Sequence, residues 1–130
     1  MLSWVQMFVL LLVSHLVGDY LLQTDWQALH KRGGLVSGDP QARRALVTHV
    51  CTYTIAFLPA LLADKLDVQL LWAIPAIFVP HLIQDDGTLI ARYMTAVKGL
   101  RPSENLPVAA DVDQTFHVVA LLLLAFALGK

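Results

Sequence analysis

The fold of this chain is decided by its first hydrophobic stretch, residues 4–22, which reads WVQMFVLLLVSHLVGDYLL. The stretch is long enough to cross the hydrocarbon of a bilayer as one helix. No Lys or Arg precedes it and no small-residue cleavage site follows its apolar part, so we expect a membrane span rather than a signal peptide. Its His15 and Asp19 are four residues apart, which places them on one helix face, and Gly18 favours close approach of a second helix.

The composition of the whole chain agrees with a membrane protein. Its 130 residues are 57% hydrophobic and 15% charged, whereas soluble domains are about one quarter charged. The formal net charge is −1, so no basic character indicates nucleic acid as a partner. The single cysteine, Cys51, cannot form a disulfide within the chain.

Three further hydrophobic stretches follow the first. We therefore expect an all-α integral membrane protein, with residues 1–130 forming one transmembrane domain. It would be a four-helix bundle with spans at about 4–22, 45–63, 68–83 and 107–128. Pro75 and Pro80 predict a kink in the third span, and Pro107 suits the first turn of the fourth.

Basic residues indicate how the spans are oriented. Loop one, about residues 24–44, and loop three, about residues 86–106, hold seven of the nine Lys and Arg residues. Loop two, about residues 64–67, is very short. By the positive-inside tendency, loops one and three are expected in the cytoplasm and both termini outside.

Apolar residues recur at helical spacing in loop three. They are Leu89, Ile90, Tyr93, Met94 and Val97. This pattern predicts an interfacial amphipathic helix on the cytoplasmic face, or a continuation of the third span.

Each expected span contains a histidine, and three of these histidines have an aspartate four residues away. The pairs are His15 with Asp19, His81 with Asp85 and Asp113 with His117, while His49 lies four residues before Tyr53. Because neighbouring spans run in opposite directions, each of these aspartates lies nearer the cytoplasmic surface and its histidine about 5–6 Å deeper. Such groups are costly in a bilayer, so this layering predicts one shared polar site.

No Lys or Arg lies inside the expected spans to neutralise the aspartates. Each centrally placed Asp costs about 2.5–3.5 kcal/mol on insertion scales, and a bound divalent cation would offset this cost. Imidazole and carboxylate favour zinc, with Mn, Fe, Co or Ni as alternatives, and the groups could hold one ion or two. The predicted metal ligands are His15, Asp19, His49, His81, Asp85, Asp113 and His117. Polar contacts between helices, or a proton path, would explain the same residues without a metal.

Other roles follow from position. Asp19, Asp85 and Asp113 are candidate catalytic residues, as general base or as groups that orient a ligand. Gln23 and Gln114 are candidate substrate-binding residues. Asp86 competes with Asp85 for the site, although the two differ by about 100° around the helix.

The motifs also support a resemblance to a known family. The string His15-Leu-Val-Gly-Asp19-Tyr-Leu-Leu-Gln23-Thr-Asp25-Trp26, then His49, then His81-x-x-x-Asp85, then Asp113-Gln114-x-x-His117 resembles the small bacterial and phage membrane proteins grouped as family 3307 of unknown function. The resemblance implies a bacterial inner membrane but no established activity. The layout is more loosely similar to membrane-bound metal-dependent hydrolases.

Three functions are compatible with these features. The first is a metal-dependent hydrolase that activates water near the cytoplasmic surface and cleaves a lipid or lipid-linked ester or phosphoester. The second is binding or transport of a metal ion or proton, and the third is a non-enzymatic membrane module that assembles as a homo-oligomer. Membrane lipids are expected partners in each case.

Overall fold

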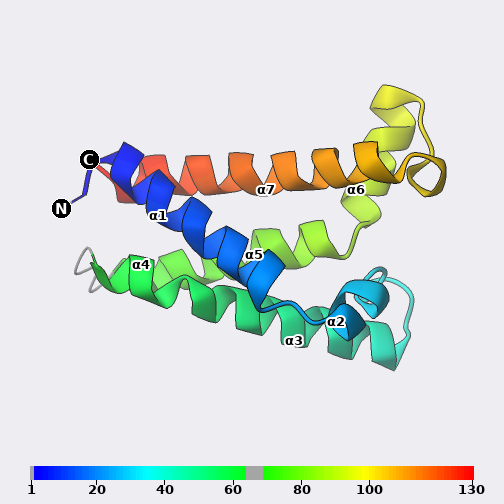
Figure 1. Cartoon of the computed structure of the whole chain (residues 1–130), viewed down its shortest axis with the longest axis horizontal. Coiled ribbons are helices and arrows are strands. Elements are labelled where there is room, and N and C mark those ends of the chain that lie inside the picture. The colour runs from blue at the N-terminus through cyan, green and yellow to red at the C-terminus, as the bar shows by residue number, and fades with distance from the viewer. Residues whose placement is uncertain (1, 64–68) are drawn as a thin grey trace.

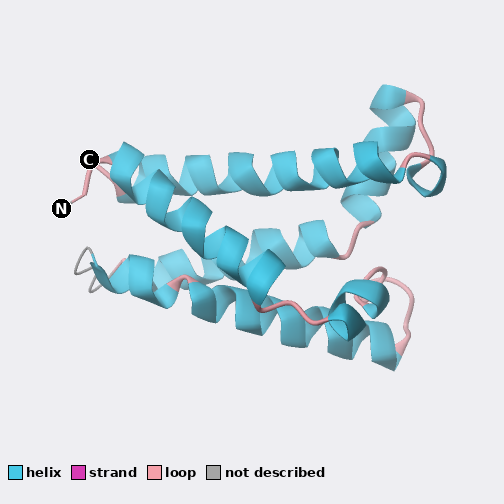
Figure 2. Ribbon diagram, in the orientation of Figure 1, coloured by secondary structure: helices cyan, strands magenta, loops and turns pink. Residues whose placement is uncertain are grey.

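A computed structural model describes residues 2–63 and 69–130. All regular elements in these ranges are helices, as expected (Figure 2). The expected loop two, residues 64–67, and residue 68 of the expected third span lie outside the described residues. The long helices are α1 (Trp4–Leu16), α3 (Pro40–Ala56), α5 (Leu70–Asp85) and α7 (Leu106–Leu128), and together they form a bundle (Figure 1).

The membrane prediction is supported for three helical stretches rather than four. Trp4–Leu21, Pro40–Ala63 and Leu106–Leu128 are long and apolar enough to cross a bilayer. Helix α5, with 16 residues, is not among them. At 1.5 Å per residue it is about 24 Å long, which is short of the roughly 30 Å of hydrocarbon.

Helix α1 begins with a reciprocal cap and ends in a π-helical turn. The Ser3 hydroxyl accepts from the Gln6 amide, and the Gln6 side chain accepts from the Ser3 amide, so two helix-end donors are satisfied. After Leu16 the chain continues as the π-helix η1 (Val17–Leu21). A Cβ at Gly18 would lie 2.6 Å from Cδ2 of Tyr53, so the predicted close helix approach at this glycine is confirmed.

Loop one contains a short helix that the hydrophobic pattern does not predict. Helix α2 (Asp25–His30) has a capping box between Thr24 and Gln27 and packs against α3. Helix α3 then begins at Pro40, earlier than the expected start at 45, because Asp39 caps it by accepting from the Gln41 amide. After α3 the chain continues as α4 (Leu58–Ala63).

Loop three contains the expected amphipathic segment, as α6 (Thr88–Tyr93) followed by the π-helix η2 (Met94–Lys98). Gly87 has a φ of 81° and separates α6 from α5, so the segment is not a continuation of the third span. Ile90 and Met94 are buried against Ala109 and Val112 of α7. A 3₁₀ turn, η3 (Pro102–Glu104), precedes α7.

An apolar core fills the half of the bundle that carries the termini. It includes Met7, Leu11, Phe57, Leu61, Ile77, Leu121, Leu124 and Leu128. The two ends of the chain meet there, because the Trp4 amide donates to the Lys130 carbonyl at 3.3 Å (Figure 1). The buried polar side chains lie instead toward the other half, where the loops are.

Candidate metal centre

Four buried imidazoles lie together, one from each long helix. The exposed fractions of His15, His49, His81 and His117 are 0%, 0%, 2% and 2%. The ring centroid of His81 is 5.2 Å from that of His49 and 4.7 Å from that of His117, and His117 is 5.4 Å from His15. The structure therefore brings all four predicted histidines into one cluster.

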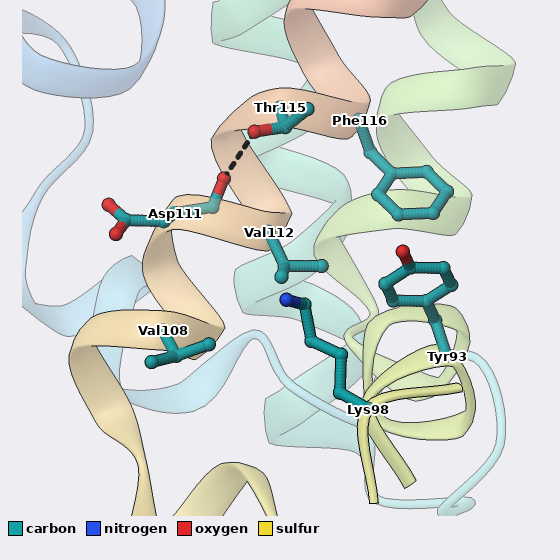
Figure 3. A pocket seen from close by; sticks show the side chains of 7 residues that line it. All are labelled: Tyr93, Lys98, Val108, Asp111, Val112, Thr115 and Phe116. Carbon is teal, nitrogen blue, oxygen red and sulfur yellow. Dashed lines mark hydrogen bonds between the residues drawn. The ribbon is translucent and has the colours of Figure 1, made fainter. Parts of the chain in front are cut away.

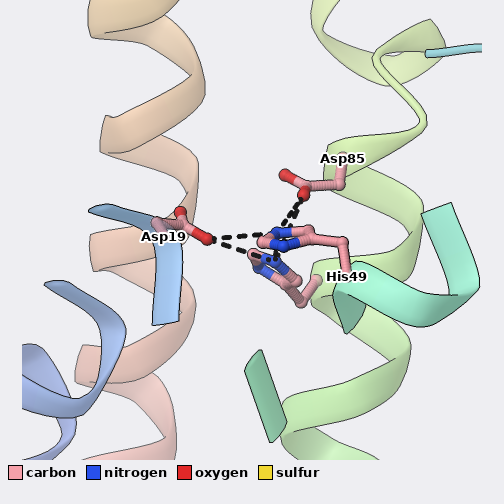
Figure 4. Close-up of side chains that lie close together, drawn as sticks. Asp19, His49 and Asp85 are labelled. Atoms are coloured by element: carbon pink, nitrogen blue, oxygen red, sulfur yellow. Dashed lines mark hydrogen bonds and ion pairs between the residues drawn. The ribbon is translucent and has the colours of Figure 1, made fainter. Parts of the chain in front are cut away.

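Two of these imidazoles and two carboxylates form the tightest group. His49 lies between Asp19 of η1 and Asp85 of α5 (Figure 4). Its Nε2 atom is 2.9 Å from Asp85 Oδ2, 3.3 Å from Asp19 Oδ1 and 3.1 Å from His81 Nε2. His81 Nε2 is in turn 3.2 Å from Asp85 Oδ2 and 3.5 Å from Asp19 Oδ1. We call Asp19, His49, His81 and Asp85 the four-ligand group.

The spacing of these four atoms suits a tetrahedral ion. Bonds of about 2.0–2.1 Å to a central zinc place neighbouring ligand atoms about 3.3–3.4 Å apart. Five of the six separations in the group are between 2.9 and 3.5 Å, and all four atoms lie within 4.8 Å of one another. The geometry thus fits a divalent cation held by two imidazoles and two carboxylates.

Hydrogen bonding alone accounts poorly for these contacts. Each Nε2 can carry one hydrogen, so at most two of the five close contacts are hydrogen bonds. Asp19 Oδ1 lies within ion-pair distance of both Nε2 atoms, yet it is buried and accepts no hydrogen bond from the described residues. A central cation would attract all four atoms at once.

A second group shares Asp85 with the first. Asp85, Asp113 and His117 also offer ligand atoms within 4.8 Å of one another. The Nδ1 atom of His117 is 2.8 Å from the Asp113 carbonyl, which can only accept, so Nδ1 carries the hydrogen. In the neutral imidazole, the other nitrogen, Nε2, has a lone pair that faces Asp85 Oδ1 at 3.3 Å and forms no hydrogen bond with any described residue. Two facing lone pairs repel, and a cation between them would remove the repulsion.

His15 lies beside the centre but belongs to neither group. Its Nε2 donates to the amide oxygen of Gln114 at 3.0 Å, and its Nδ1 accepts from the Tyr53 hydroxyl at 3.0 Å. Tyr53 stacks on His81, with centroids 3.4 Å apart. His15 is therefore placed to position Tyr53, and through it a ligand, and its predicted role as a ligand stays a prediction. The Gln114 oxygen is likewise engaged with His15.

Lys31 also reaches the centre, although no hydrophobic pattern in the sequence indicated it. Its ammonium, near the end of α2, is 2.5 Å from Asp85 Oδ2, and its side chain is 14% exposed. With its amide oriented to satisfy both neighbours, Gln23 accepts from the same ammonium at 2.7 Å and donates to the Asp19 carbonyl at 3.1 Å. The capping box at Thr24 is the sequence signal that could have predicted α2, and with it the approach of Lys31 to Asp85.

Asp85, rather than Asp86, faces the site. The Asp86 carboxylate accepts from the Leu35 amide at 2.7 Å and from the Thr88 hydroxyl, and its carbonyl accepts from the Gly33 amide at 2.8 Å. Asp86 thus ties loop one to the end of α5. The sequence left open which of the two acids faces the site, and the orientation of α5 about its own axis decides it in favour of Asp85.

The charges of the described centre do not balance. Three carboxylates, Asp19, Asp85 and Asp113, face one ammonium, Lys31, which leaves two negative charges when the imidazoles are neutral. One divalent ion or two imidazolium groups would compensate these charges.

Deeper in the bundle, a cavity of about 10 Å³ is lined by Tyr53, His81 and His117, among others, and it has room for about one water.

Comparison with known proteins places the chain in a family. A family model described as "Protein of unknown function (DUF3307)" matches residues 7–130. The chain belongs to this family, as its motifs predicted. No curated protein and no solved structure matches the chain.

Proposed function

We propose that this member of the DUF3307 family is a membrane-embedded hydrolase that depends on a divalent metal, zinc in the first instance. The observation that carries the proposal is the four-ligand group, whose atoms have tetrahedral spacing at a buried position. With neutral imidazoles, a dication in the same place would compensate the two remaining negative charges.

The second group supports catalysis rather than a purely structural ion. It offers three residues, which would leave a fourth position for water, as in catalytic zinc sites. Asp85 would bridge the two groups, with Oδ2 in the first and Oδ1 facing His117. Bound metal would supply hydroxide near neutral pH by lowering the pKa of its water.

Asp113 is also the carboxylate best placed to act as general base, through the oxygen that would not hold the ion. Its side chain is 21% exposed, whereas those of Asp19 and Asp85 are 6% and 1% exposed. In the proposed step, water oxygen attacks a carbonyl carbon or phosphorus and passes its proton to Asp113. The bond to the leaving oxygen breaks, and that oxygen takes up the proton.

We infer the orientation in the membrane from the basic residues of loops one and three. All four long helices would cross or enter the bilayer, with loops one and three in the cytoplasm of a bacterial cell and both termini outside. The centre would then lie just beneath the cytoplasmic headgroups, where a lipid or lipid-linked ester or phosphoester can reach it. A carboxy-terminal alkaline phosphatase fusion should be active and a fluorescent protein fusion dark, and the reverse result would overturn this orientation.

A lipid hydrolysis assay tests the proposed activity. Purified protein loaded with zinc or manganese should cleave a member of a panel of lipid esters and phosphoesters. His117→Ala and Asp113→Asn should abolish cleavage, and His30→Ala, at a half-buried position in loop one outside both groups, should not. Stoichiometric metal binding without any cleavage would remove the catalytic part of the proposal.

One observation favours a different function, a structural polar core. The ion pair between Lys31 and Asp85 gives the centre a cation of its own. In that case the module would be non-enzymatic, and chelators would alter neither its stability nor its assembly. Passage of ions across the membrane has less support, because apolar side chains fill the other half of the bundle.

A further inference from the structure

A groove of about 340 Å³ lies between the η2 segment and α7, apart from the metal centre (Figure 3). Val108, Val112 and Phe116, at successive turns of α7, give it an apolar wall, and Tyr93 and Lys98 line the opposite side. The metal-facing residues of α7 belong to a different face of that helix. The groove is therefore a separate feature, and its function does not depend on the presence of a metal.

The groove presents donors to a ligand. The Lys98 side chain extends toward Val112, and the Tyr93 ring lies beside it, below Phe116 in the view (Figure 3). Within residues 2–63 and 69–130, Lys98 forms no ion pair and the Tyr93 hydroxyl forms no hydrogen bond. The Asp111 carboxylate points away from Lys98, and the Thr115 hydroxyl already donates to the Asp111 carbonyl at 2.7 Å.

The wall beside these donors is rigid and apolar. Tyr93 packs edge-on against Phe116, with centroids 5.3 Å apart and ring planes at 75°. Val112 is 8% exposed and belongs to the small core that holds η2 against α7. An ammonium and a phenol next to such a wall match a ligand with an anionic oxygen group attached to an apolar body.

We propose that this groove binds the phosphodiester of a membrane phospholipid, with Lys98 and Tyr93 contacting the phosphate and the lipid glycerol and chains lying along Val108 and Phe116. Its volume is in the range of small-molecule sites, about 300–1,000 Å³. The groove lies at the loop end of the bundle, where lipid headgroups surround a spanning protein and where Tyr and Lys act as interfacial anchors.

Native mass spectrometry of the full chain, released from detergent with defined lipids, tests this proposal. Phosphatidylglycerol should be retained, and diacylglycerol with the same chains, which lacks the phosphate, should not. Lys98→Gln should reduce phosphatidylglycerol retention at least 5-fold. Arg92→Gln is the matched control, because Arg92 is also an exposed cation of loop three but lines a different surface.

A second variant keeps the charge and fills the groove. Val108→Trp should also reduce phosphatidylglycerol retention, and melting curves of each variant check that the fold is intact. Inorganic phosphate at millimolar concentration should not displace the lipid, since it lacks the apolar body. Equal retention by Lys98→Gln and the wild type, an equal loss with Arg92→Gln, equal retention of diacylglycerol, or displacement by phosphate would each overturn the proposal.

Discussion

Replacing His49 by alanine should empty the metal centre, whereas the same change at His15 should not. Both side chains are fully buried, so both variants leave a cavity of similar size and pay a similar stability cost, about 2–5 kcal/mol. His49 Nε2 is within 3.3 Å of three other atoms of the four-ligand group. His15 bonds to Tyr53 and Gln114 instead. The pair of variants therefore separates loss of packing from loss of a ligand.

The expected loss of metal affinity follows from the position of His49 as a ligand of the four-ligand group. Loss of a residue that merely orients a ligand costs about 10- to 100-fold in metal affinity, so loss of a ligand should cost at least about 100-fold, or about 2.8 kcal/mol. With metal at about 1,000 times the wild-type dissociation constant, binding stabilises the wild type by about 4.1 kcal/mol. The same concentration would stabilise His49→Ala by only about 1.4 kcal/mol.

The assay combines metal content with thermal unfolding. Elemental analysis should find one or two equivalents of metal in the wild type and in His15→Ala, and little in His49→Ala. At that metal concentration, a chelator should lower the melting temperature of the first two proteins clearly more than that of His49→Ala. Equal metal content in the two variants, or a wild type that contains no metal and does not respond to chelator, would show that His49 is not a metal ligand.

Four further predictions follow from the contacts of the centre. Lys31→Met should destabilise the metal-free protein by about 3–5 kcal/mol, because it leaves Asp85 buried without its partner. Metal should rescue this variant in thermal unfolding, and a failure to rescue would favour the structural role of Lys31. Gly18→Ala should lower both stability and metal affinity, because its Cβ would lie 2.6 Å from a Tyr53 ring carbon and displace the segment that carries a ligand; wild-type metal titration curves would contradict this. Asp85→Asn should abolish metal binding, whereas Asp86→Asn should weaken only the attachment of loop one, seen as faster proteolysis there with metal content retained. Metal occupancy should fall as the pH is lowered, because protons compete for the imidazole and carboxylate ligands, and a pH-independent occupancy would argue against these ligands.

The convergence of the four histidines could be predicted from the sequence because it depends on two simple rules. A spacing of four places His81 and Asp85 on one face, and alternating span direction places Asp113 before His117 at the same depth. Neither rule gives the rotation of a helix about its axis. The choice between Asp85 and Asp86, and the direction of His15 toward Tyr53, therefore required coordinates.

The other differences between the expected and the observed structure arise from a π-helical turn and a short helix in loop one. The π-helical turn Val17–Leu21 has an extra residue per turn compared with the spacing assumed for His15 and Asp19. Their side chains are still 3.5 Å apart, but Asp19 also reaches His49 and His81 on other helices. Helix α2 is only six residues long, so hydrophobic periodicity gave no signal for it or for the approach of Lys31.

X-ray absorption spectroscopy at the metal edge, on protein purified without chelator, would observe the ligands of the bound ion themselves. We expect a first shell of nitrogen and oxygen at about 2.0–2.1 Å for zinc, with the multiple-scattering signature of imidazole that weakens in His81→Ala. A metal-free sample that cannot be loaded, or a bound ion whose spectrum shows no imidazole and does not change in that variant, would contradict the proposed metal centre.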